Sequence, residues 1–456
     1  MTAADVLARL TAALPTGAVI TDRGVVTEHS QDQSQEPWSP DALALVKVRS
    51  AEEVSRVLVI ANETRTPVVP QGSRSSVTGA SNAIDGAILL DLSGMRRIEI
   101  IDELERIAVV QPGVLIEELQ HKVAARGLFY PPDPGSVEIA SIGGSVATNA
   151  GGMRCIKYGV TRDSVRSLEI VLADGSIMTT RARTAKDVSG LDITDLIIGS
   201  EGTLAVVTEV TLALRPAPGP ALAVTATFAS VGDALDAANA VAAGERLPST
   251  LEIIDGLAIK ALREFSAEVD LPADAEAWLV AVTDEHVGAE QDLDRFEAAF
   301  RANGALTVER SSTPEGTERL LKARRLLNPA TNAYRPGHLH SDAAIPRSLL
   351  REFGEQVLAF AAEQGIEVSL SGHVGDGNLH PVVFYQPGEE EQAGRVLDFM
   401  LELAAEFEGT VTGEHGVGIE KLAAVRSQFD PRRLELQRAL KAAFDPNGIL
   451  NPGRKF

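Results

Sequence analysis

The sequence of 456 residues contains a single cysteine, Cys155. One thiol cannot form a disulfide within the chain, and an iron–sulfur cluster needs several cysteine ligands. The sequence therefore excludes an internal disulfide framework and a cluster held by this chain alone. We expect Cys155 to be a small buried or loop thiol rather than a nucleophile.

Aromatic residues are also scarce, at 4%, although apolar residues make up 44% of the chain. This composition is typical of a globular protein whose core consists mainly of aliphatic and alanine side chains. Basic residues are outnumbered, with 42 Lys and Arg against 64 Asp and Glu, and the formal net charge is −22. Such a charge argues against nucleic acid and anionic membrane surfaces as partners, because their phosphates would be repelled.

Long hydrophobic runs are absent as well. No stretch of about 18 apolar residues occurs, and no apolar segment follows a basic N-terminus. The first residues, MTAADVLARLTAALP, instead predict an amphipathic helix. We therefore expect no membrane span and a cytoplasmic location.

The length allows two or three domains. Residues 40–70 predict a strand–helix–strand unit, with a helix capped at Ser50. The Pro- and Gly-rich segment 216–221 is the expected domain boundary. Beyond it, alternating strands and helices predict an α+β domain with an antiparallel sheet.

Three loops rich in Gly and Ser lie at strand ends in the first half, at 70–81, 134–152 and 199–204. Glycine lets the backbone approach a ligand closely and direct N–H groups at it. No loop has the Walker A pattern or the G-x-G-x-x-G spacing of a dinucleotide fold. A single loop of this kind could be an ordinary surface loop, but three in one domain favour a large dinucleotide ligand.

The second half contains the stretch SGHVGDGNLH, with His373 and His380 seven positions apart, and then TGEHGVG, which includes Glu414. His373 ends one predicted strand and His380 begins the next, so a hairpin would bring the two rings together. Two histidines and a carboxylate suit a divalent ion with open positions, such as Zn²⁺ or Mn²⁺. Ordinary polar loops and an acid–base site remain alternatives at this point.

The loop sequences PVVPQGSRSSVTGAS, SIGGSVATNAGG and IGSEGTLAVVTEVTL resemble the FAD-binding domain of the vanillyl-alcohol oxidase/p-cresol methylhydroxylase superfamily. GHVGDGNLH, GEHGVG and FDPNGILNPGR are similar to its D-2-hydroxy-acid dehydrogenase branch. That branch includes the glycolate oxidase catalytic subunit, D-lactate dehydrogenase and D-2-hydroxyglutarate dehydrogenase. The resemblance runs from about residue 20 to the C-terminus.

The resemblance implies an α+β fold with a two-subdomain FAD-binding domain of the p-cresol methylhydroxylase type and a ferredoxin-like substrate, or cap, domain. We expect the FAD-binding domain at 1–215, the cap domain with its antiparallel sheet at 216–425, and a C-terminal segment at 426–456 that returns to the FAD domain.

The resemblance also implies a set of FAD-binding positions. From the first loop and its flanks they are Pro70, Gly72, Ser73, Arg74, Ser75, Ser76, Gly79 and Ser81. From the second they are Pro134, Gly135, Ser136, Ile142, Gly143, Gly144, Ser145, Asn149, Gly152 and Tyr158. The remaining positions are Glu201, Gly202, Val207 and Asn451.

The first loop departs from the family pattern Gly-x-Gly-Thr. Arg74 stands in place of the second Gly, and Ser75 in place of the Thr. Arg74 has two possible orientations, toward the pyrophosphate or away from it. Relatives with covalent flavin often carry a His in this loop, which has none here. We therefore predict noncovalent FAD.

The resemblance implies roles for the second-half residues. His373, His380 and Glu414 would bind the metal, and His415 would be the base that takes the substrate's hydroxyl proton. Arg324 would bind the substrate carboxylate, and Asn378 would line the site. His340 stands where D-2-hydroxyglutarate-type relatives carry a Lys for a distal carboxylate.

The electrons would leave through an electron-transfer flavoprotein, a quinone or a separate iron–sulfur subunit, and a homodimer is possible. Three other functions agree less well with the motifs. A transferase of the alkylglycerone-phosphate synthase type would favour a run of consecutive histidines, which is absent. A chemically inactive FAD subunit of a glycolate oxidase complex would not need GHVGDGNLH and GEHGVG. A flavin-free hydrolytic metalloprotein would leave the three loops unexplained.

Overall fold

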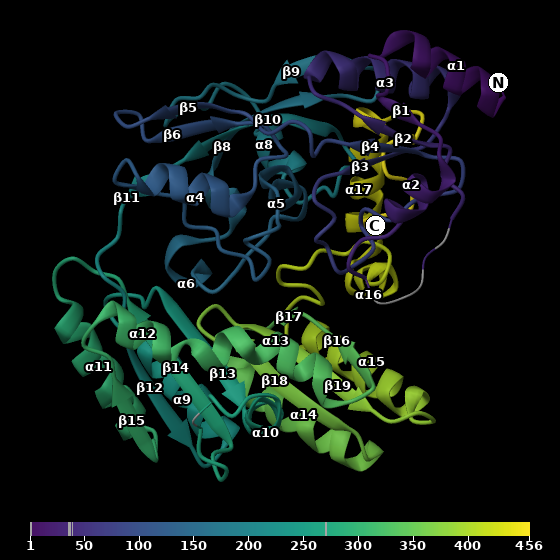
Figure 1. Cartoon of the computed structure of the whole chain (residues 1–456). Coiled ribbons are helices and arrows are strands. Elements are labelled where there is room, and N and C mark those ends of the chain that lie inside the picture. The colour runs from purple at the N-terminus through teal and green to yellow at the C-terminus, as the bar shows by residue number, and fades with distance from the viewer. Residues whose placement is uncertain (1, 35–37, 39, 270) are drawn as a thin grey trace. The chain divides into compact units, whose positions relative to one another are not determined.

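The computed structural model describes residues 2–34, 38, 40–269 and 271–456 (Figure 1). The chain divides into two compact units. The first contains Met1–Gly151, Gly159–Ala217 and Glu414–Phe456, and the second contains Gly152–Tyr158 and Pro218–Gly413. The division into 1–215, 216–425 and 426–456 stays a prediction about the family's domains.

The first unit begins with a four-stranded sheet in the order β1-β2-β4-β3, in which β1 is Val19–Ile20. Strands β2 (Ala44–Lys47) and β3 (Val68–Gln71) both pair in parallel with β4 (Ile88–Asp91). Between β2 and β3, helix α3 (Ala51–Thr64) begins at Ser50, whose hydroxyl accepts the Glu53 amide. The strand–helix–strand unit predicted for residues 40–70 is confirmed.

A second, antiparallel sheet of this unit has the order β5-β6-β10-β8-β9. Its strands are β5 (Ile98–Asp102), β6 (Ile107–Val110), β10 (Val206–Ala213), β8 (Val165–Val171) and β9 (Ile177–Thr179). Helices α4 (Ile116–Ala124) and α5 (Ile142–Thr148) share its apolar core. This core supports the ends of the second and third Gly-rich loops.

The second unit is built on one antiparallel sheet in the order β15-β12-β14-β13-β18-β19-β16, with β17 paired to β19. The strands are β12 (Leu222–Phe228), β13 (Thr250–Asp255), β14 (Ala277–Thr283), β15 (Thr307–Arg310), β16 (Gly337–His340), β17 (Ala343–Ala344), β18 (Glu367–His373) and β19 (Asn378–Tyr385). Its first four strands, in the order β15-β12-β14-β13, have the arrangement of a ferredoxin-like unit. The antiparallel sheet predicted for this half is confirmed.

Helices cover both faces of this sheet (Figure 1). One face packs against α9 (Val231–Ala242), α11 (Ala289–Ala302), α14 (Leu350–Gln364) and α15 (Glu390–Glu406). The other packs against α10 (Gly256–Phe265), α12 (Pro314–Leu320) and α13 (Lys322–Tyr334). Because successive side chains of a strand point to opposite faces, Leu279 enters the first core and Trp278 the second. All seven residues of β14 are therefore buried.

The end of the chain belongs to the first unit by its contacts. Ile449 and Leu450 are buried, and Leu450 forms a parallel bridge to Val68 at the edge of β3. The last residues therefore pack beside the strand that leads into the first Gly-rich loop.

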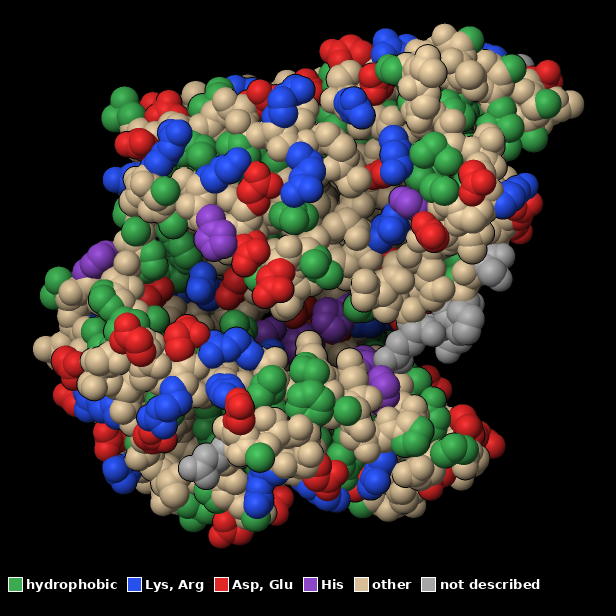
Figure 2. Space-filling view, in the orientation of Figure 1, with side chains coloured by type: hydrophobic (Ala, Val, Ile, Leu, Met, Phe, Trp, Pro, Cys, Tyr) green, Lys and Arg blue, Asp and Glu red, His purple; other side chains and the backbone are tan. Residues whose placement is uncertain are grey.

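The remaining elements are short or peripheral. They are α1 (Ala3–Ala13), β1 (Val19–Ile20), α2 (Arg23–Glu28), β7 (Leu128–Phe129), α6 (Cys155–Tyr158), α7 (Thr161–Ser164), α8 (Ile193–Ile197), β11 (Arg215–Pro216), η1 (Arg347–Leu349), α16 (Leu422–Gln428) and α17 (Pro431–Phe444). On the face shown in Figure 2, Lys and Arg side chains are interspersed with Asp and Glu. In the described part of the chain, no helix has the length and apolar character needed to cross a membrane.

Candidate functional site

The first two Gly-rich loops touch one another in the first unit. The Ser141 amide donates to the Ser73 hydroxyl at 3.2 Å. A Cβ added at Gly72 would lie 2.5 Å from the Ser141 hydroxyl oxygen, so a larger residue there would require the Ser141 side chain to move. Glycine at position 143 is equally constrained, because its added Cβ would lie 2.5 Å from Cβ of Pro112. The glycines thus bring backbone segments together at the ends of β3 and α5.

Arg74 adopts φ 55°, in the left-handed region that glycine favours. Arg74 therefore has a backbone conformation that glycine, which the family pattern has at this position, adopts without strain. The positive charge of Arg74 also acts on the imidazole of His29. Burial lowers the pKa of His29 below its ordinary value, and the Arg74 cation lowers it further.

Buried polar atoms around these loops lack hydrogen-bond partners within the described residues. They are Oε1 of Gln71, Oγ of Ser81, Oγ of Ser145 and Oδ1 of Asn451. Buried polar groups are rarely left unsatisfied, so such a set indicates a polar ligand. A flavin dinucleotide, with its ring carbonyls, ribityl hydroxyls and phosphates, offers matching groups. The residues present therefore fit FAD.

Asn451 connects the C-terminal segment to these loops. Its side-chain amide donates to the Ala80 carbonyl at 2.9 Å and to the Glu201 carbonyl at 2.7 Å. Glu201 is also buried, and its carboxylate accepts the Val417 and Gly418 amides, each at 2.8 Å. The Glu201 side chain thus anchors the segment that follows His415.

Several predicted FAD residues are placed in other surroundings. The Tyr158 hydroxyl donates to Oδ2 of Asp284 at 2.6 Å, and both Tyr158 and Gly152 belong to the second unit. Val207 lies in the core beneath β10. FAD binding by these three residues stays a prediction, as it does for the rest of the FAD set.

In the second unit, the predicted hairpin joins β18 to β19. His373 ends β18, and His380 is the third residue of β19. Their rings are edge to face, with centroids 4.8 Å apart. A Cβ added at Gly372 would lie 2.8 Å from the Asn378 carbonyl oxygen, which explains glycine at this point of the hairpin. The hairpin thus brings the two imidazoles side by side.

Glu252 on β13 was not singled out in the sequence, yet it contacts two of the predicted site residues. Its Oε1 lies 2.7 Å from Nδ1 of His373, and its Oε2 lies 2.6 Å from Nε of Arg324. The Glu252 side chain is fully buried. Burial raises the pKa of Glu252, but the electrostatic interactions and hydrogen bonds with His373 and Arg324 outweigh it, and the pKa falls below its usual value. A carboxylate inside the otherwise apolar strand segment LEII was the available signal.

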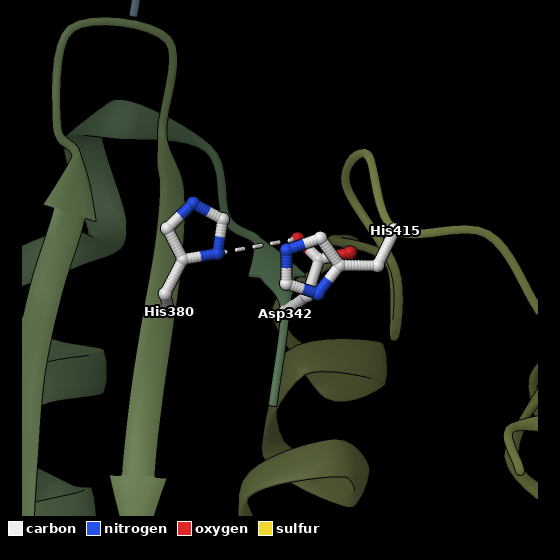
Figure 3. Close-up of side chains that lie close together, drawn as sticks. All are labelled: Asp342, His380 and His415. Carbon is white, nitrogen blue, oxygen red and sulfur yellow. Dashed lines mark ion pairs between the residues drawn. The ribbon is translucent and has the colours of Figure 1, made fainter. Parts of the chain in front are cut away.

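Asp342, also missed, lies behind the second histidine. Figure 3 shows its carboxylate facing His380, with Oδ1 3.8 Å from Nδ1. Its Oδ2 accepts the Thr412 hydroxyl and the Gly413 amide, each at 2.9 Å. Asp342 therefore anchors the last residues of the second unit, immediately before Glu414.

Potential ligand atoms gather here in two overlapping groups, each within 4.8 Å. The groups are Asp342, His380 and His415, and His373, His380 and Glu414. Imidazole and carboxylate donors together suit Zn²⁺ or Mn²⁺. The residues present thus fit a divalent ion, and metal binding stays a prediction.

Asn378 and His340 complete the predicted set. Asn378 is buried, and its Oδ1 has no hydrogen-bond partner among the described residues. His340 is exposed on β16, and its Nε2 lies 2.9 Å from Oδ1 of Asn332. His340 shares that strand with His338, and their ring centroids are 5.1 Å apart.

Known families match most of the chain. Residues 42–181 match the family described as "FAD binding domain", and residues 218–454 match "FAD linked oxidases, C-terminal domain". The second match alone covers more than half of the sequence. The chain belongs to the FAD-linked oxidase family, and it is an FAD-linked oxidoreductase.

Similar proteins carry related names. "Glycolate oxidase subunit GlcD" of Bacillus subtilis is 38% identical over 91% of this chain and 89% of its own length. "D-lactate dehydrogenase" of Archaeoglobus fulgidus is 35% identical over 92% of both chains. "D-lactate dehydrogenase [cytochrome], mitochondrial" of Arabidopsis thaliana is 34% identical over 89% of this chain and 72% of its own.

Solved structures show the same fold at low identity. A p-cresol methylhydroxylase crystal structure matches with a TM-score of 0.80 and 16% identity, covering 99% of this chain and 96% of the other. An alkyldihydroxyacetonephosphate synthase matches with a TM-score of 0.75 and 17% identity, covering 99% and 85%. The predicted α+β fold of the p-cresol methylhydroxylase type is confirmed.

Proposed function

We propose that this protein oxidises a D-2-hydroxy acid of the D-lactate, glycolate or D-2-hydroxyglutarate class to the 2-oxo acid. The observation that carries the proposal is the largely buried Arg324–Glu252–His373 chain of contacts beside His380. It would combine a cation that binds the substrate carboxylate with imidazoles that bind a metal, the two functions that a 2-hydroxy acid requires. The names of the glycolate oxidase and D-lactate dehydrogenase relatives support the same substrate class.

The oxidation removes a hydride from Cα and a proton from the hydroxyl. When bound, FAD supplies the acceptor for the hydride, and a Zn²⁺ or Mn²⁺ ion supplies a Lewis acid for the substrate oxygens. His373, His380 and Glu414 would hold the ion. Within the described part of the chain, the terminal nitrogens of Arg324 make no hydrogen bond, so both are available to a carboxylate. His415, next to Glu414, would accept the hydroxyl proton.

The side chain of the acid would meet Asn378 and His340. Asn378 supplies a buried amide oxygen, and His340 an exposed imidazole. A short acid such as D-lactate would not need His340, whereas a second carboxylate would favour its cationic form. In the proposal, Asn378 and His340 therefore determine how long an acid the site accepts.

In this proposal FAD is noncovalent and lies in the first unit, among the three Gly-rich loops. The electrons pass to an electron-transfer flavoprotein, a quinone or a separate iron–sulfur subunit. The word "subunit" in the name of the Bacillus relative indicates that this relative is part of an assembly, and it supports partner subunits for the present protein as well. The proposal also includes a cytoplasmic location and a possible homodimer.

An anaerobic screen tests the function. The flavin-loaded protein is mixed with D- and L-lactate, glycolate and D-2-hydroxyglutarate, and flavin absorbance is followed with time. A D-acid or glycolate should bleach the flavin, and L-lactate should not. A flavin that no acid of this panel reduces would contradict the proposed substrate class. Repeating the screen after chelation tests the metal.

A further inference from the structure

Glu252 differs from Asp255, the other buried carboxylate of β13. Asp255 accepts hydrogen bonds from Ser369 at 2.7 Å, from the Leu370 amide at 3.1 Å and from the Ala258 amide at 3.2 Å. These contacts join a strand to its neighbours and begin helix α10. Glu252 instead divides its two oxygens between His373 and Arg324. Asp255 therefore supports the fold, whereas Glu252 contacts the proposed site.

The contact with Glu252 determines which ring nitrogen of His373 carries the proton. The ionised Glu252 carboxylate can only accept a hydrogen bond, so Nδ1 of His373 must carry the proton that is donated. In a neutral imidazole, Nε2 then holds the lone pair that a metal needs. Buried carboxylates behind metal-binding histidines act in this way in many metalloproteins.

The contact with Arg324 orients the second functional group. Glu252 engages Nε, on one edge of the planar guanidinium, at 2.6 Å. The terminal nitrogens remain for a bidentate pair with a substrate carboxylate. The Arg324 side chain is only 13% exposed, so the guanidinium is held in a restricted environment.

We infer that Glu252 is a positioning residue that sets both the metal-binding nitrogen of His373 and the carboxylate-binding edge of Arg324. This inference rests on the proposed function and extends it to a residue outside the predicted site. One buried carboxylate then links the metal to the substrate carboxylate. A change at Glu252 affects both binding events, although Glu252 touches neither ligand.

The test uses the full-length, flavin-loaded protein with Glu252→Gln and Glu252→Asp. In Glu252→Gln, the amide N–H₂ would face one of the two donors, His373 Nδ1–H or Arg324 Nε–H. In Glu252→Asp, the shorter side chain would not reach both of these groups. Zn²⁺ affinity is measured by competition with a chelator, and KM and kcat are measured with the acid found in the screen. We expect Zn²⁺ to bind about 10–100-fold more weakly in Glu252→Gln, with a raised KM. Glu252→Asp should show a smaller loss of both.

Asp255→Asn is the matched control, because it neutralises a buried carboxylate of the same strand. Its Zn²⁺ affinity and KM should stay within about twofold of the parent's, as expected for a site away from both ligands. Flavin content and the melting temperature report folding in each variant. If Glu252→Gln does not fold, the Zn²⁺ affinity and KM of Glu252→Asp, which keeps the negative charge, test the inference.

The outcomes separate two failures. A parent that binds Zn²⁺ and oxidises the acid, with Glu252 variants equal to it in Zn²⁺ affinity and KM, overturns this inference alone. Equal losses in Asp255→Asn and Glu252→Gln also overturn it, because they assign both residues the same structural role. A parent that binds no Zn²⁺ overturns the metal part of the proposed function and this inference together.

Discussion

Glu201 accepts the backbone amide of Val417 at 2.8 Å, although 216 residues separate them in the chain. Its second oxygen accepts the Gly418 amide at 2.8 Å, and Lys455 Nζ lies 3.2 Å from the first. The Glu201 backbone has φ 53°, which points to a position held by its surroundings. One buried carboxylate thus joins the third Gly-rich loop to the segment that carries His415.

Glu201→Gln should lower the stability of the folded protein and the rate of oxidation together. An amide has one acceptor oxygen, so one of the two backbone N–H groups would face an N–H₂ group instead. The loss of a hydrogen bond to a charged group should destabilise the protein by about 2–3 kcal/mol. Thermal unfolding and kcat measure the two effects. Glu209→Gln, a change at a partly exposed acid of β10, should alter neither, and equal behaviour of the two variants would contradict the anchoring role.

His29 should make stability depend on pH below about 6.5, its reference pKa. Burial and the Arg74 cation lower the pKa of His29 in the folded state. Between the lowered folded pKa and the unfolded pKa, the unfolded chain binds more protons, so acid favours unfolding. This contribution is complete above the unfolded pKa and is lost as pH falls through the folded pKa.

The measurement is the melting temperature of the parent and His29→Gln between about pH 5 and 8, the range in which histidine titrates. The parent should lose stability more steeply than the variant below about pH 6.5. His121→Gln, at an exposed position of α4, provides the control and should follow the parent. Parallel curves for all three proteins would show that His29 does not titrate as described.

His380→Ala should remove the metal. Its ring lies beside that of His373 and belongs to both groups of candidate ligands. Element analysis of protein prepared without chelator should show about one divalent ion per parent chain. His286→Ala, at an exposed histidine of the same unit, should retain it. Retained metal with full activity in His380→Ala would refute the proposed site.

Arg454→Met should weaken flavin binding without loss of the metal. Arg454 is buried, and it donates to the Gly79 carbonyl at 3.1 Å and to the Asn82 carbonyl at 3.0 Å. These bonds hold the end of the first Gly-rich loop in place. Flavin fluorescence released on dilution measures the change, and a dissociation constant raised about tenfold corresponds to about 1.4 kcal/mol. Arg432→Met, at an exposed residue of α17, should bind flavin like the parent.

Flavin should leave the polypeptide on acid denaturation. The first Gly-rich loop contains no histidine that could bond to the flavin. The denatured protein is separated from small molecules by filtration, and the yellow colour should appear in the filtrate. Colour that remains with the precipitated chain would show a covalent link instead.

Much of the local structure follows from the sequence. The apolar runs of β12 and β14, the Ser50 cap of α3 and the Asp174–Gly175 turn of the β8–β9 hairpin all have short-range causes. The hairpin that brings His373 and His380 together is local too, since the two residues lie only seven positions apart. The Gly and Ser content of the first two loops was visible in the sequence, whereas the close neighbours of Gly72 and Gly143, Ser141 and Pro112, are known only from the structure.

These elements, the family and the two histidines could be predicted from the sequence, because each depends on a few neighbouring residues or on a motif. The position of Glu252 could not, since it contacts His373, 121 residues away, and Arg324, 72 residues away, through tertiary packing alone. The same holds for Asp342, which faces His380, and for Glu201, whose carboxylate accepts hydrogen bonds from backbone amides. Such carboxylates follow no periodicity, since their positions depend on which strands and helices pack together. Their burial costs the loss of bound water, and this cost is offset only where the fold places their partners close by.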